Sequence, residues 1–296
     1  MKILLLGARG NLGGQLKKVF AEHDVIPWDR EEIDITDKTL IIKKIVDLKP
    51  DVVINAAAYN AVDKCEEDEA EYELAERING DAPGYIAQGV LKAGSILIHY
   101  SSDYVFGGDI KDEDDIKRME EAGGFKEDDD TAPINKYGET KLLGEKNIIS
   151  LSGKGLKWYI IRTSKLFGQL GDSAGAKPSF FDLMQKLGET RQELDVVDEE
   201  VSCFTYTTDL AQATKDLLDE RAGFGIYHFI NEGAMTWHMG AKIMFSMLEK
   251  NIKLNAVTGD KFPRPAKRPK YSVLANTKFK KLRSFKKALR EYLDEK

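Results

Sequence analysis

The chain has 296 residues, of which 42% are hydrophobic and 32% charged, with a formal net charge of −6 and a sequence pI of about 5.5. This composition can bury a sizeable core, which excludes wholesale disorder, and the acidic balance argues against a general nucleic-acid or anionic-membrane binder. No apolar run approaches the ~18 residues of a membrane span, and the two cysteines, Cys65 and Cys203, are too few for a disulfide framework, so we expect a cytoplasmic protein.

The first half of the chain alternates short apolar runs with longer amphipathic stretches. That alternation predicts a parallel sheet covered by helices on both faces, that is, a doubly wound α/β Rossmann fold. The expected strands are residues 3–6, 25–27, 51–55, 96–100 and 160–162, and the expected helices are 12–22, one that begins at Thr36 or Asp37, 79–92 and 137–150.

The second half follows a different pattern. Residues 178–187, 208–218 and 237–248 are expected to be helical, and residues 168–177 to form a mobile loop. Residues 109–130 are acidic and poor in apolar side chains, which predicts a solvated insertion with a short helix over 112–122. We therefore expect a dinucleotide-binding domain over 1–168 and a smaller substrate-binding lobe over 169–296, packed on the first and sharing some segments with it.

A glycine-rich turn follows the first expected strand and opens the first expected helix. Gly7 permits the tight turn, Gly10 lets the backbone approach a diphosphate, and Gly13 lets the helix pack on the strand. The positive end of the helix then faces the phosphates. We expect a dinucleotide here, bound by the turn residues Gly7, Arg9, Gly10, Asn11, Leu12 and Gly13.

The end of the second strand is expected to reach the adenosine ribose. Asp29 can accept hydrogen bonds from a 2′-hydroxyl, as NADH requires, whereas Arg30, helped by Arg9, can bind the 2′-phosphate of NADPH. The two arginines slightly favour NADP(H), and NAD(H) stays open as the cofactor. Further contacts are expected from Asp34 and Ile35 beside the adenine, and from Ala57, Ala58 and Tyr59 after the third strand.

A second constellation offers an acid, a cation and a hydroxyl. Tyr137 and Lys141 are four residues apart and share one helix face, and Ser102 follows a buried strand at the edge where doubly wound sheets bind ligands. Reduction of a ketone requires a proton for its oxygen, and a free tyrosine, with a pKa of about 10, is a slow acid. We expect the Lys141 ammonium to lower the pKa of Tyr137, and Ser102 to hydrogen-bond the carbonyl oxygen.

These residues resemble the extended short-chain dehydrogenase/reductase family and, more narrowly, the dTDP-4-dehydrorhamnose reductases. The resemblance implies NAD(P)H-dependent reduction of the 4-keto group of dTDP-4-dehydrorhamnose, with Tyr137 as proton donor, Lys141 as its partner, Ser102 where threonine is frequent, and Asp103 on the sugar. It rests on GARGNLGGQL (7–16), EEIDITD (31–37), PDVVINAAAYNAVDKCE (50–66), HYSSDYVFGG (99–108), APINKYGETKLLGEKNI (132–148), IIRTSKLFG (160–168), TYTTDLA (205–211), GIYHFINEG (225–233) and RPKYSVL (268–274).

The chain departs from this family's pattern around the substrate. Lys165 stands where an aromatic ring often meets the sugar, and Ser202 and Phe204 stand where glycine and proline are common. The insertion 109–130 is also longer than expected. The reaction type is therefore more firmly indicated than the identity of the nucleotide-sugar, whose ring is expected to meet Ser102, Asp103, Tyr137 and Lys165.

The partner is expected to be a nucleotide-diphosphate sugar. A basic run contains Lys261, Arg264, Lys267, Arg268 and Lys270, and its cations, Arg268 among them, suit a diphosphate, although a solvated basic surface explains them equally. The four histidines lack metal-ligand spacing, so no metal is expected. Neither a nucleic acid nor a membrane is expected, and a homodimer stays open.

Two other functions fit the same scaffold. A non-catalytic nucleotide-binding subunit, similar to the regulatory subunit of methionine adenosyltransferase, would explain the altered substrate residues, but the complete Ser102, Tyr137 and Lys141 set argues against it. A sugar-nucleotide dehydratase or epimerase is the other alternative. The family's dehydratases carry an acid after the Ser/Thr-Asp pair, and Tyr104 at that position argues against dehydration.

Overall fold

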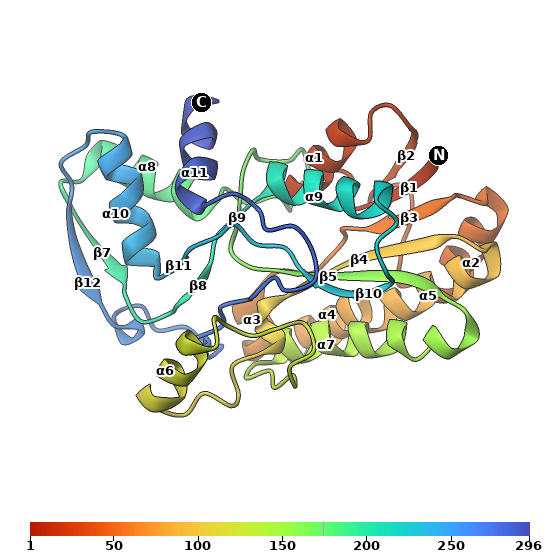
Figure 1. The fold of residues 1–296 in the computed structure, drawn as a ribbon, viewed down its shortest axis with the longest axis horizontal. Coiled ribbons are helices and arrows are strands. Elements are labelled where there is room, and N and C mark those ends of the chain that lie inside the picture. Colours follow the sequence, from red (N-terminus) through yellow and green to blue (C-terminus); the bar gives the residue numbers. More distant parts are fainter. Residues whose placement is uncertain (174) are drawn as a thin grey trace.

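A six-stranded parallel sheet forms the centre of the computed structural model, which describes residues 1–173 and 175–296. Its strand order is β10-β5-β4-β3-β1-β2 (Figure 1), so the chain moves outward from β1 in one direction and then crosses to the other side, as in doubly wound folds. The predicted α/β Rossmann architecture is confirmed. The strands are β1 (Lys2–Leu6), β2 (Asp24–Trp28), β3 (Val52–Asn55), β4 (Ile96–Ser102), β5 (Lys157–Thr163) and β10 (Gly225–His228).

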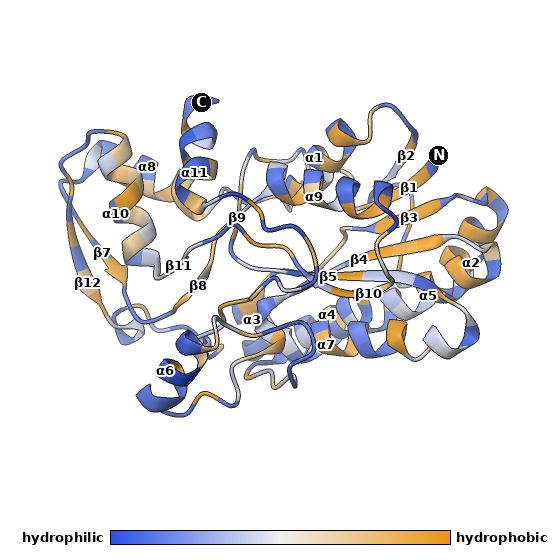
Figure 2. Cartoon of the chain, viewed as in Figure 1, coloured by the Kyte–Doolittle hydropathy of each residue, from blue (hydrophilic) through white to orange (hydrophobic). Residues whose placement is uncertain are grey.

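Helices cover both faces of this sheet because alternate strand residues point to opposite sides. Leu5 packs with helices α1 and α9 on one face, whereas Leu4 and Leu6 pack with α2, α5 and α7 on the other. Figure 1 shows the two helical layers above and below the strands, and Figure 2 shows the strands as a hydrophobic layer between them. The helices are α1 (Asn11–Val19), α2 (Lys38–Leu48), α5 (Ala82–Ala93), α7 (Lys136–Ile149) and α9 (Thr207–Asp219), with α3 (Val62–Glu67) and α4 (Glu69–Ala75) before α5.

The helix predicted over 79–92 begins differently in the structure. A π-helical turn over Glu76–Asp81 leads into α5. Pro83, in the first turn of α5, has no N–H to donate, which suits the start of a helix rather than its interior. The predicted cap of the second helix is confirmed, since the Asp37 side chain accepts a hydrogen bond from the Leu40 amide at 2.9 Å.

A second hydrophobic cluster lies beyond the carboxyl ends of the strands. It is built from α8 (Phe180–Thr190), α10 (Trp237–Met247) and α11 (Phe285–Asp294) around Phe181, Phe204 and Phe285. β10 and α9, which follow residue 168 in sequence, belong to the central sheet and its covering layer, and the predicted boundary at residue 168 stays a prediction. Short strand pairs complete this part: β7 (Glu193–Val197) with β12 (Lys253–Val257), β8 (Ser202–Cys203) with β11 (Ala234–Met235), and β6 (Leu166–Phe167) with β9 (Thr205–Tyr206).

The acidic insertion carries the predicted short helix, α6 (Glu113–Glu121), which has no buried residue and is hydrophilic in Figure 2. Its partly buried Ile116 and Met119 pack on a small cluster that includes Phe125 and Tyr271. The predicted loop over 168–177 has neither helix nor strand where it is described, and residue 174 lies outside the described residues.

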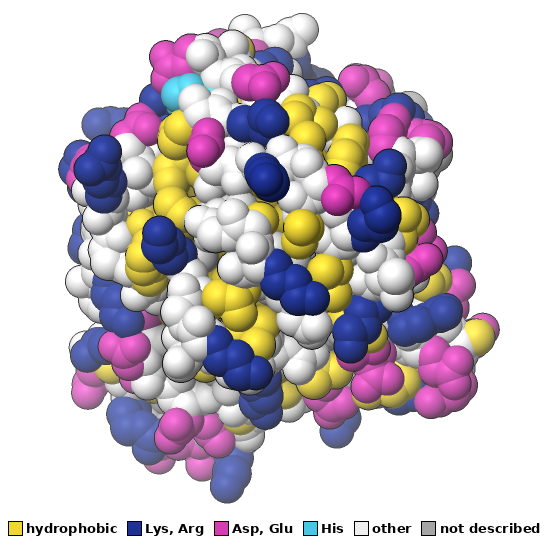
Figure 3. Space-filling view, turned by 90° about the vertical axis from the view of Figure 1, so that its right-hand side faces the viewer, with side chains coloured by type: hydrophobic (Ala, Val, Ile, Leu, Met, Phe, Trp, Pro, Cys, Tyr) yellow, Lys and Arg dark blue, Asp and Glu magenta, His cyan; other side chains and the backbone are white. Residues whose placement is uncertain are grey.

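The surface at the right-hand end of Figure 1 mixes both charge signs. Figure 3 shows basic and acidic side chains interspersed over this face, with hydrophobic side chains in small groups between them. Within the described residues, every helix is too short or too polar to cross a membrane.

Candidate active site

The glycine turn forms the cradle that the sequence predicts. Gly7 has φ of 76°, and a Cβ there would lie 2.6 Å from the Ala57 amide nitrogen. A Cβ on Gly13 would collide with the Gly7 carbonyl, whereas Gly10, the N-cap of α1, meets only that carbonyl at 3.4 Å. A side chain is therefore excluded at Gly7 and Gly13, and Gly171 packs against the backbone of residues 9–11, so this turn is a tightly packed start of α1 of the kind that binds a diphosphate.

The other residues of this turn hold it in place. The Asn11 side chain accepts a hydrogen bond from the Gly171 amide at 2.9 Å and donates one to the Lys177 carbonyl at 3.1 Å, so residues 171 and 177 are tied to the turn. Leu12 is buried in the core against the sheet. The structure therefore gives Asn11 and Leu12 anchoring contacts within the protein.

The adenosine end of the site is organised around Asp29. Its carboxylate accepts hydrogen bonds from the Arg9 amide at 3.0 Å and the Arg30 amide at 2.9 Å. The Arg9 guanidinium pairs with Glu31 and, at 2.9 Å, with Glu32. The charge of the Arg9 guanidinium is thus already neutralised by two carboxylates. A 2′-phosphate, which the sequence predicts as its partner, would have to compete with them.

Two nearby predicted contacts have local roles as well. The Asp34 carboxylate accepts hydrogen bonds from the amide and hydroxyl of Thr36 at 2.9 and 2.7 Å, which shapes the turn before α2. Ile35 is buried against the sheet. Both lie in the segment between β2 and α2, and their contact with an adenine stays a prediction.

The segment after β3 lies next to the glycine turn. The Ala57 amide donates to the Asn55 side chain at 3.2 Å, and Ala58 is partly buried. Tyr59 is held at both ends, because its amide donates to Asn79 at 2.9 Å and its hydroxyl donates to Glu71. The backbone of Ala57 packs closely against Gly7, while Tyr59 is fixed by helical neighbours.

Helix α7 and strand β4 bring Tyr137 and Ser102 together. Ser102 ends β4, and its hydroxyl opposes the rise that burial causes in the pKa of the neighbouring Tyr137 phenol while donating a hydrogen bond to Asp103 at 3.1 Å. The phenol also lies 3.5 Å from the Asn60 side-chain oxygen. The predicted tyrosine and serine therefore meet at the carboxyl edge of the sheet, close to the segment that follows β3.

Lys141 is buried one turn further along α7. Its ammonium donates to the Tyr100 carbonyl at 2.7 Å, and burial lowers the pKa of Lys141 to about 8. Burial, followed by the charge of Asp103, raises the pKa of Tyr137. Loss of hydration governs the pKa of the phenol in this structure, and lowering of that pKa by Lys141 stays a prediction.

Asp103 is fully enclosed beside Ser102. Its carboxylate accepts hydrogen bonds from the hydroxyls of Ser102 at 3.1 Å, Ser164 at 2.7 Å and Ser272 at 2.7 Å. Burial raises the pKa of Asp103, and these donors oppose that shift. Ser102 must turn its proton from Asp103 in order to donate to a ligand, and Ser164 and Ser272 keep the carboxylate solvated when it does.

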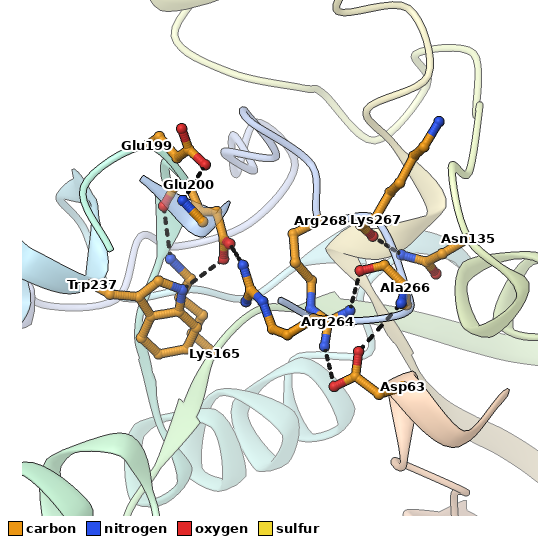
Figure 4. A network of polar contacts seen from close by, with 11 residues as sticks. Asp63, Asn135, Lys165, Glu199, Glu200, Trp237, Arg264, Ala266, Lys267 and Arg268 are labelled. Atoms are coloured by element: carbon orange, nitrogen blue, oxygen red, sulfur yellow. Dashed lines mark hydrogen bonds and ion pairs between the residues drawn. The ribbon is translucent and has the colours of Figure 1, made fainter. Parts of the chain in front are cut away.

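A network of polar contacts, which we call the Glu200 network, lies beside these residues (Figure 4). The Glu200 carbonyl accepts from Lys165 at 3.0 Å, and its carboxylate accepts from Trp237 at 2.8 Å and from Arg264. Sequence reasoning missed Glu200 and Trp237, which carry no local motif. Together with Lys165 and Arg264 they join β8, α10 and the end of β5.

Residues 264–268 cross from this network to the dinucleotide-binding part. Arg268 pairs with Asp63 at 2.8 Å, and Asn135 donates to the Lys267 carbonyl at 2.8 Å (Figure 4). Asn135 also caps α7, because its side chain accepts the Gly138 amide at 2.8 Å. An asparagine three residues before a helical glycine was a visible capping signal, yet the sequence interpretation overlooked it.

Several buried polar atoms at the same edge of the sheet lack a hydrogen-bond partner within the described residues. They include the hydroxyls of Ser101 and Thr163, near the ends of β4 and β5, and the His99 Nε2. Orphaned donors and acceptors at a ligand-binding edge fit a bound polar group. No group of three metal-ligating side chains occurs among the described residues.

Comparisons with known proteins place this geometry among reductases. The family model described as RmlD substrate binding domain matches residues 1–296. A dTDP-4-dehydrorhamnose reductase of Aggregatibacter actinomycetemcomitans is 34% identical over 94% of this chain and 91% of its own. Crystal structures of dTDP-4-dehydrorhamnose reductases from Clostridium acetobutylicum (37% identity, TM-score 0.87, 100% and 99% of the two chains) and Bacillus anthracis in complex with NADP (31%, 0.86, 100% of both) are also similar.

Proposed function

This chain belongs to the RmlD family of dTDP-4-dehydrorhamnose reductases, and we propose that it reduces the 4-keto group of dTDP-4-dehydrorhamnose, giving dTDP-L-rhamnose, with Tyr137 as the proton donor. The observation that carries the assignment of roles is the meeting of Tyr137 and Ser102 at the carboxyl edge of the sheet, one helical turn from the buried Lys141. A phenol, a hydroxyl and an ammonium in this arrangement can protonate a ketone oxygen.

The cofactor is a nicotinamide dinucleotide, held by the Gly7–Gly13 turn with its diphosphate against the start of α1. When bound, the reduced nicotinamide supplies a hydride to the carbonyl carbon. We propose a slight preference for NADPH. It stays slight because Glu31 and Glu32 compete with a 2′-phosphate for Arg9, and because the Asp29 carboxylate remains nearby.

The chain's own residues then complete the reduction. Tyr137 gives its proton to the carbonyl oxygen, and the Lys141 charge favours the phenolate that remains. Ser102 releases Asp103 and donates to the same oxygen, which stabilises the negative charge that develops there. Tyr137 is then reprotonated from solvent before the next turnover.

The substrate's other groups meet the surrounding residues. We propose that Asp103 and Lys165 contact the sugar, and that Arg268 contacts the diphosphate. Arg268 is paired with Asp63 at 2.8 Å, with 11% of the arginine side chain exposed, so the diphosphate must compete with this carboxylate. The pairing holds the Arg268 guanidinium in one position until the substrate arrives.

The decisive experiment follows the loss of reduced-nicotinamide absorbance with dTDP-4-dehydrorhamnose. We expect Tyr137→Phe to lower kcat by roughly 10²–10⁴-fold while leaving cofactor affinity within about two-fold. Tyr85→Phe, on α5 away from the site, is the matched control and should retain full activity. Equal turnover by wild type and Tyr137→Phe would remove the assigned acid.

Assembly and location are separate proposals. We propose a homodimer in the cytoplasm as the working state of the enzyme. Sedimentation at assay concentration and fractionation of the producing cell test these two statements directly.

A further inference from the structure

Lys165 has a backbone conformation that a lysine rarely adopts. Its φ is 38°, in the left-handed region where glycine or asparagine costs less. It lies two residues beyond the end of β5, whose last residue, Thr163, pairs in register with Ser102. Strained residues persist where the surrounding structure or the function requires the side chain. The contacts of the Lys165 side chain are therefore expected to compensate for this unfavourable backbone conformation.

Two aromatic rings hold the ammonium of Lys165 in place. Its nitrogen lies 4.0 Å from the centroid of the Trp237 ring and 5.2 Å from that of Phe204. Figure 4 shows Lys165 lying against Trp237 within the Glu200 network. A cation over aromatic faces is attracted to them and is restricted in where it can move. The two aromatic rings thus restrict the position of the ammonium within the Glu200 network.

This ammonium has unused hydrogen-bonding capacity. It can donate three hydrogen bonds, and one is found, to the Glu200 carbonyl at 3.0 Å. Among the residues that the structure describes, no carboxylate oxygen lies within 4.0 Å of it. The nearby carboxylates already have partners: Glu200 binds Trp237 and Arg264, and Asp103 binds three hydroxyls.

A desolvated cation with spare donors is stabilised by any oxygen that reaches it. Burial lowers the pKa of Lys165 to about 8, and the charge of Asp103 partly opposes that shift. The pairing of Thr163 with Ser102 brings the segment that carries Lys165 to the same end of the sheet. A ligand whose carbonyl lies at Ser102 and Tyr137 therefore brings its neighbouring ring substituents toward Lys165.

We propose that Lys165 is a specificity-determining residue that donates a hydrogen bond to a ring hydroxyl of the nucleotide-linked keto-sugar. This inference rests on the proposed function and adds the feature that the substrate must carry. A sugar that lacks this hydroxyl leaves the desolvated ammonium without that partner, and such a mismatch is penalised far more than a missing methylene. The enzyme should therefore reject deoxygenated rings.

The experiment pairs a deletion on the enzyme with a deletion on the substrate. We compare kcat/KM for dTDP-4-dehydrorhamnose with that for its 2-deoxy and 3-deoxy analogues, in wild type and in Lys165→Met. Wild type should prefer the hydroxylated sugar over one of the two analogues by about 100-fold, and Lys165→Met should reduce that ratio to below about 5-fold, chiefly through KM. Lys242→Met, an exposed lysine on α10, is the control and should keep the wild-type ratio.

A merely structural lysine predicts a different result. If Lys165 served only to hold the Glu200 carbonyl, Lys165→Met would slow all three substrates by one factor and leave the ratio unchanged, which would overturn the inference. Lys165→Arg, which keeps a cationic donor, should retain at least part of the ratio. An unchanged ratio with an active enzyme rejects this inference alone, whereas an inactive wild type rejects the proposed function and this inference with it.

The pH dependence of the ratio is a second readout. The charged or titratable groups that face Lys165 are Asp103, Glu200, Cys203 and Arg264. As the pH rises through about 8, the ammonium becomes a neutral amine and a weaker donor, so the preference should decline. Loss of the Lys141 proton affects all three sugars alike and cancels in the ratio. A preference that is constant from pH 6.5 to about 9.5 would contradict the assignment.

Discussion

The ammonium of Lys141 donates a hydrogen bond to the backbone carbonyl of Tyr100 at 2.7 Å, so the middle of α7 is joined to β4 just before Ser102. Lys141 is buried, and it shares its helix face with Tyr137 one turn earlier. The strand therefore fixes the lysine directly. It also sets the distance between the helix that carries the phenol and the strand that carries the serine.

This contact predicts how turnover responds to pH. Burial lowers the pKa of Lys141 from 10.5 to about 8, so the ammonium is present below pH 8 and is lost as the pH rises. We expect kcat at saturating sugar to fall through an inflection near pH 8. Lys141→Met should lower kcat by roughly 10²–10³-fold and abolish the inflection, and Lys141→Arg should move it beyond pH 10 if the variant remains active. An unchanged inflection in an active Lys141→Arg would show that another group titrates.

The same group gives a signature in folding. Since the unfolded chain holds this proton up to about pH 10.5 and the folded chain releases it near pH 8, the unfolded state binds more protons between these values. The contribution of Lys141 to the free energy of unfolding should therefore increase from pH 8 to 10.5. Urea titrations of wild type and Lys141→Met across this range measure the difference between them.

Asn135 is expected to affect both stability and substrate affinity. Its side chain caps α7 at Gly138 and holds the carbonyl of Lys267, each at 2.8 Å. Asn135→Ala should lower the free energy of unfolding by about 1 kcal/mol through the lost cap. It should also raise KM for the nucleotide-sugar by about 10-fold, because residues 264–268 lose their tether to α7.

A matched cap distinguishes the two effects. The Asp112 side chain caps α6 through the amides of Asp114 and Asp115, on the exposed insertion. Asp112→Ala should cost a similar or smaller free energy of unfolding and leave KM at the wild-type value. Equal changes of KM in the two variants would mean that Asn135 acts through stability alone.

Helix α7 is also held by a buried ion pair. Glu145 and Arg162 bond through two contacts of 2.9 and 2.7 Å, and their side chains are 1% and 3% exposed. Glu145→Gln should lower the free energy of unfolding by about 3–5 kcal/mol, because the arginine loses its counter-charge inside the core. The double variant Glu145→Met, Arg162→Leu should recover a large part of that loss.

Urea unfolding of Glu145→Met, Arg162→Leu and the double variant measures the coupling. The exposed pair of Lys43 and Asp47, at 2.5 Å on α2, is the control, and Asp47→Asn should change the free energy of unfolding by about 0.5 kcal/mol or less. If the free energies of unfolding lost by Glu145→Met and by Arg162→Leu added up to the loss in the double variant, the two residues would not be coupled, which would contradict the pairing argument.

Local sequence patterns predicted the elements that build the site. The turn from Gly7 to Gly13 and the spacing of Tyr137 and Lys141 each lie within one short segment, so their geometry follows from the strand–turn–helix unit or from the helical repeat alone. The helix α11 was missed, although its buried Phe285, Leu289 and Tyr292 recur at helical spacing, because lysines dominate the surrounding sequence.

Contacts between distant segments carried no such pattern. Ser272 meets Asp103 across 169 residues, and Arg268 meets Asp63 across 205. A serine or an arginine has many possible partners, and the packing of the lobe on the sheet selects among them. The direction in which the pKa of Tyr137 shifts could likewise not be predicted from sequence, since it depends on how completely the phenol is desolvated in the fold.

The cofactor preference is expected to depend on the competition for Arg9. The Arg9 guanidinium pairs with Glu31 and Glu32, yet both carboxylates are exposed, and exposed pairs of this kind contribute at most about 1 kcal/mol. A 2′-phosphate carries more charge than either carboxylate and can therefore displace them.

Arg9→Ala should raise the Kd of NADPH by about 10-fold and that of NADH by less than 2-fold. Glu31→Gln combined with Glu32→Gln should lower the Kd of NADPH and leave that of NADH unchanged. Fluorescence titration at two salt concentrations measures both constants, with Lys17→Ala on α1 as the control for a general loss of positive charge. If Arg9→Ala weakened the two cofactors equally, the guanidinium would act on the shared diphosphate, and the preference would have to come from Arg30.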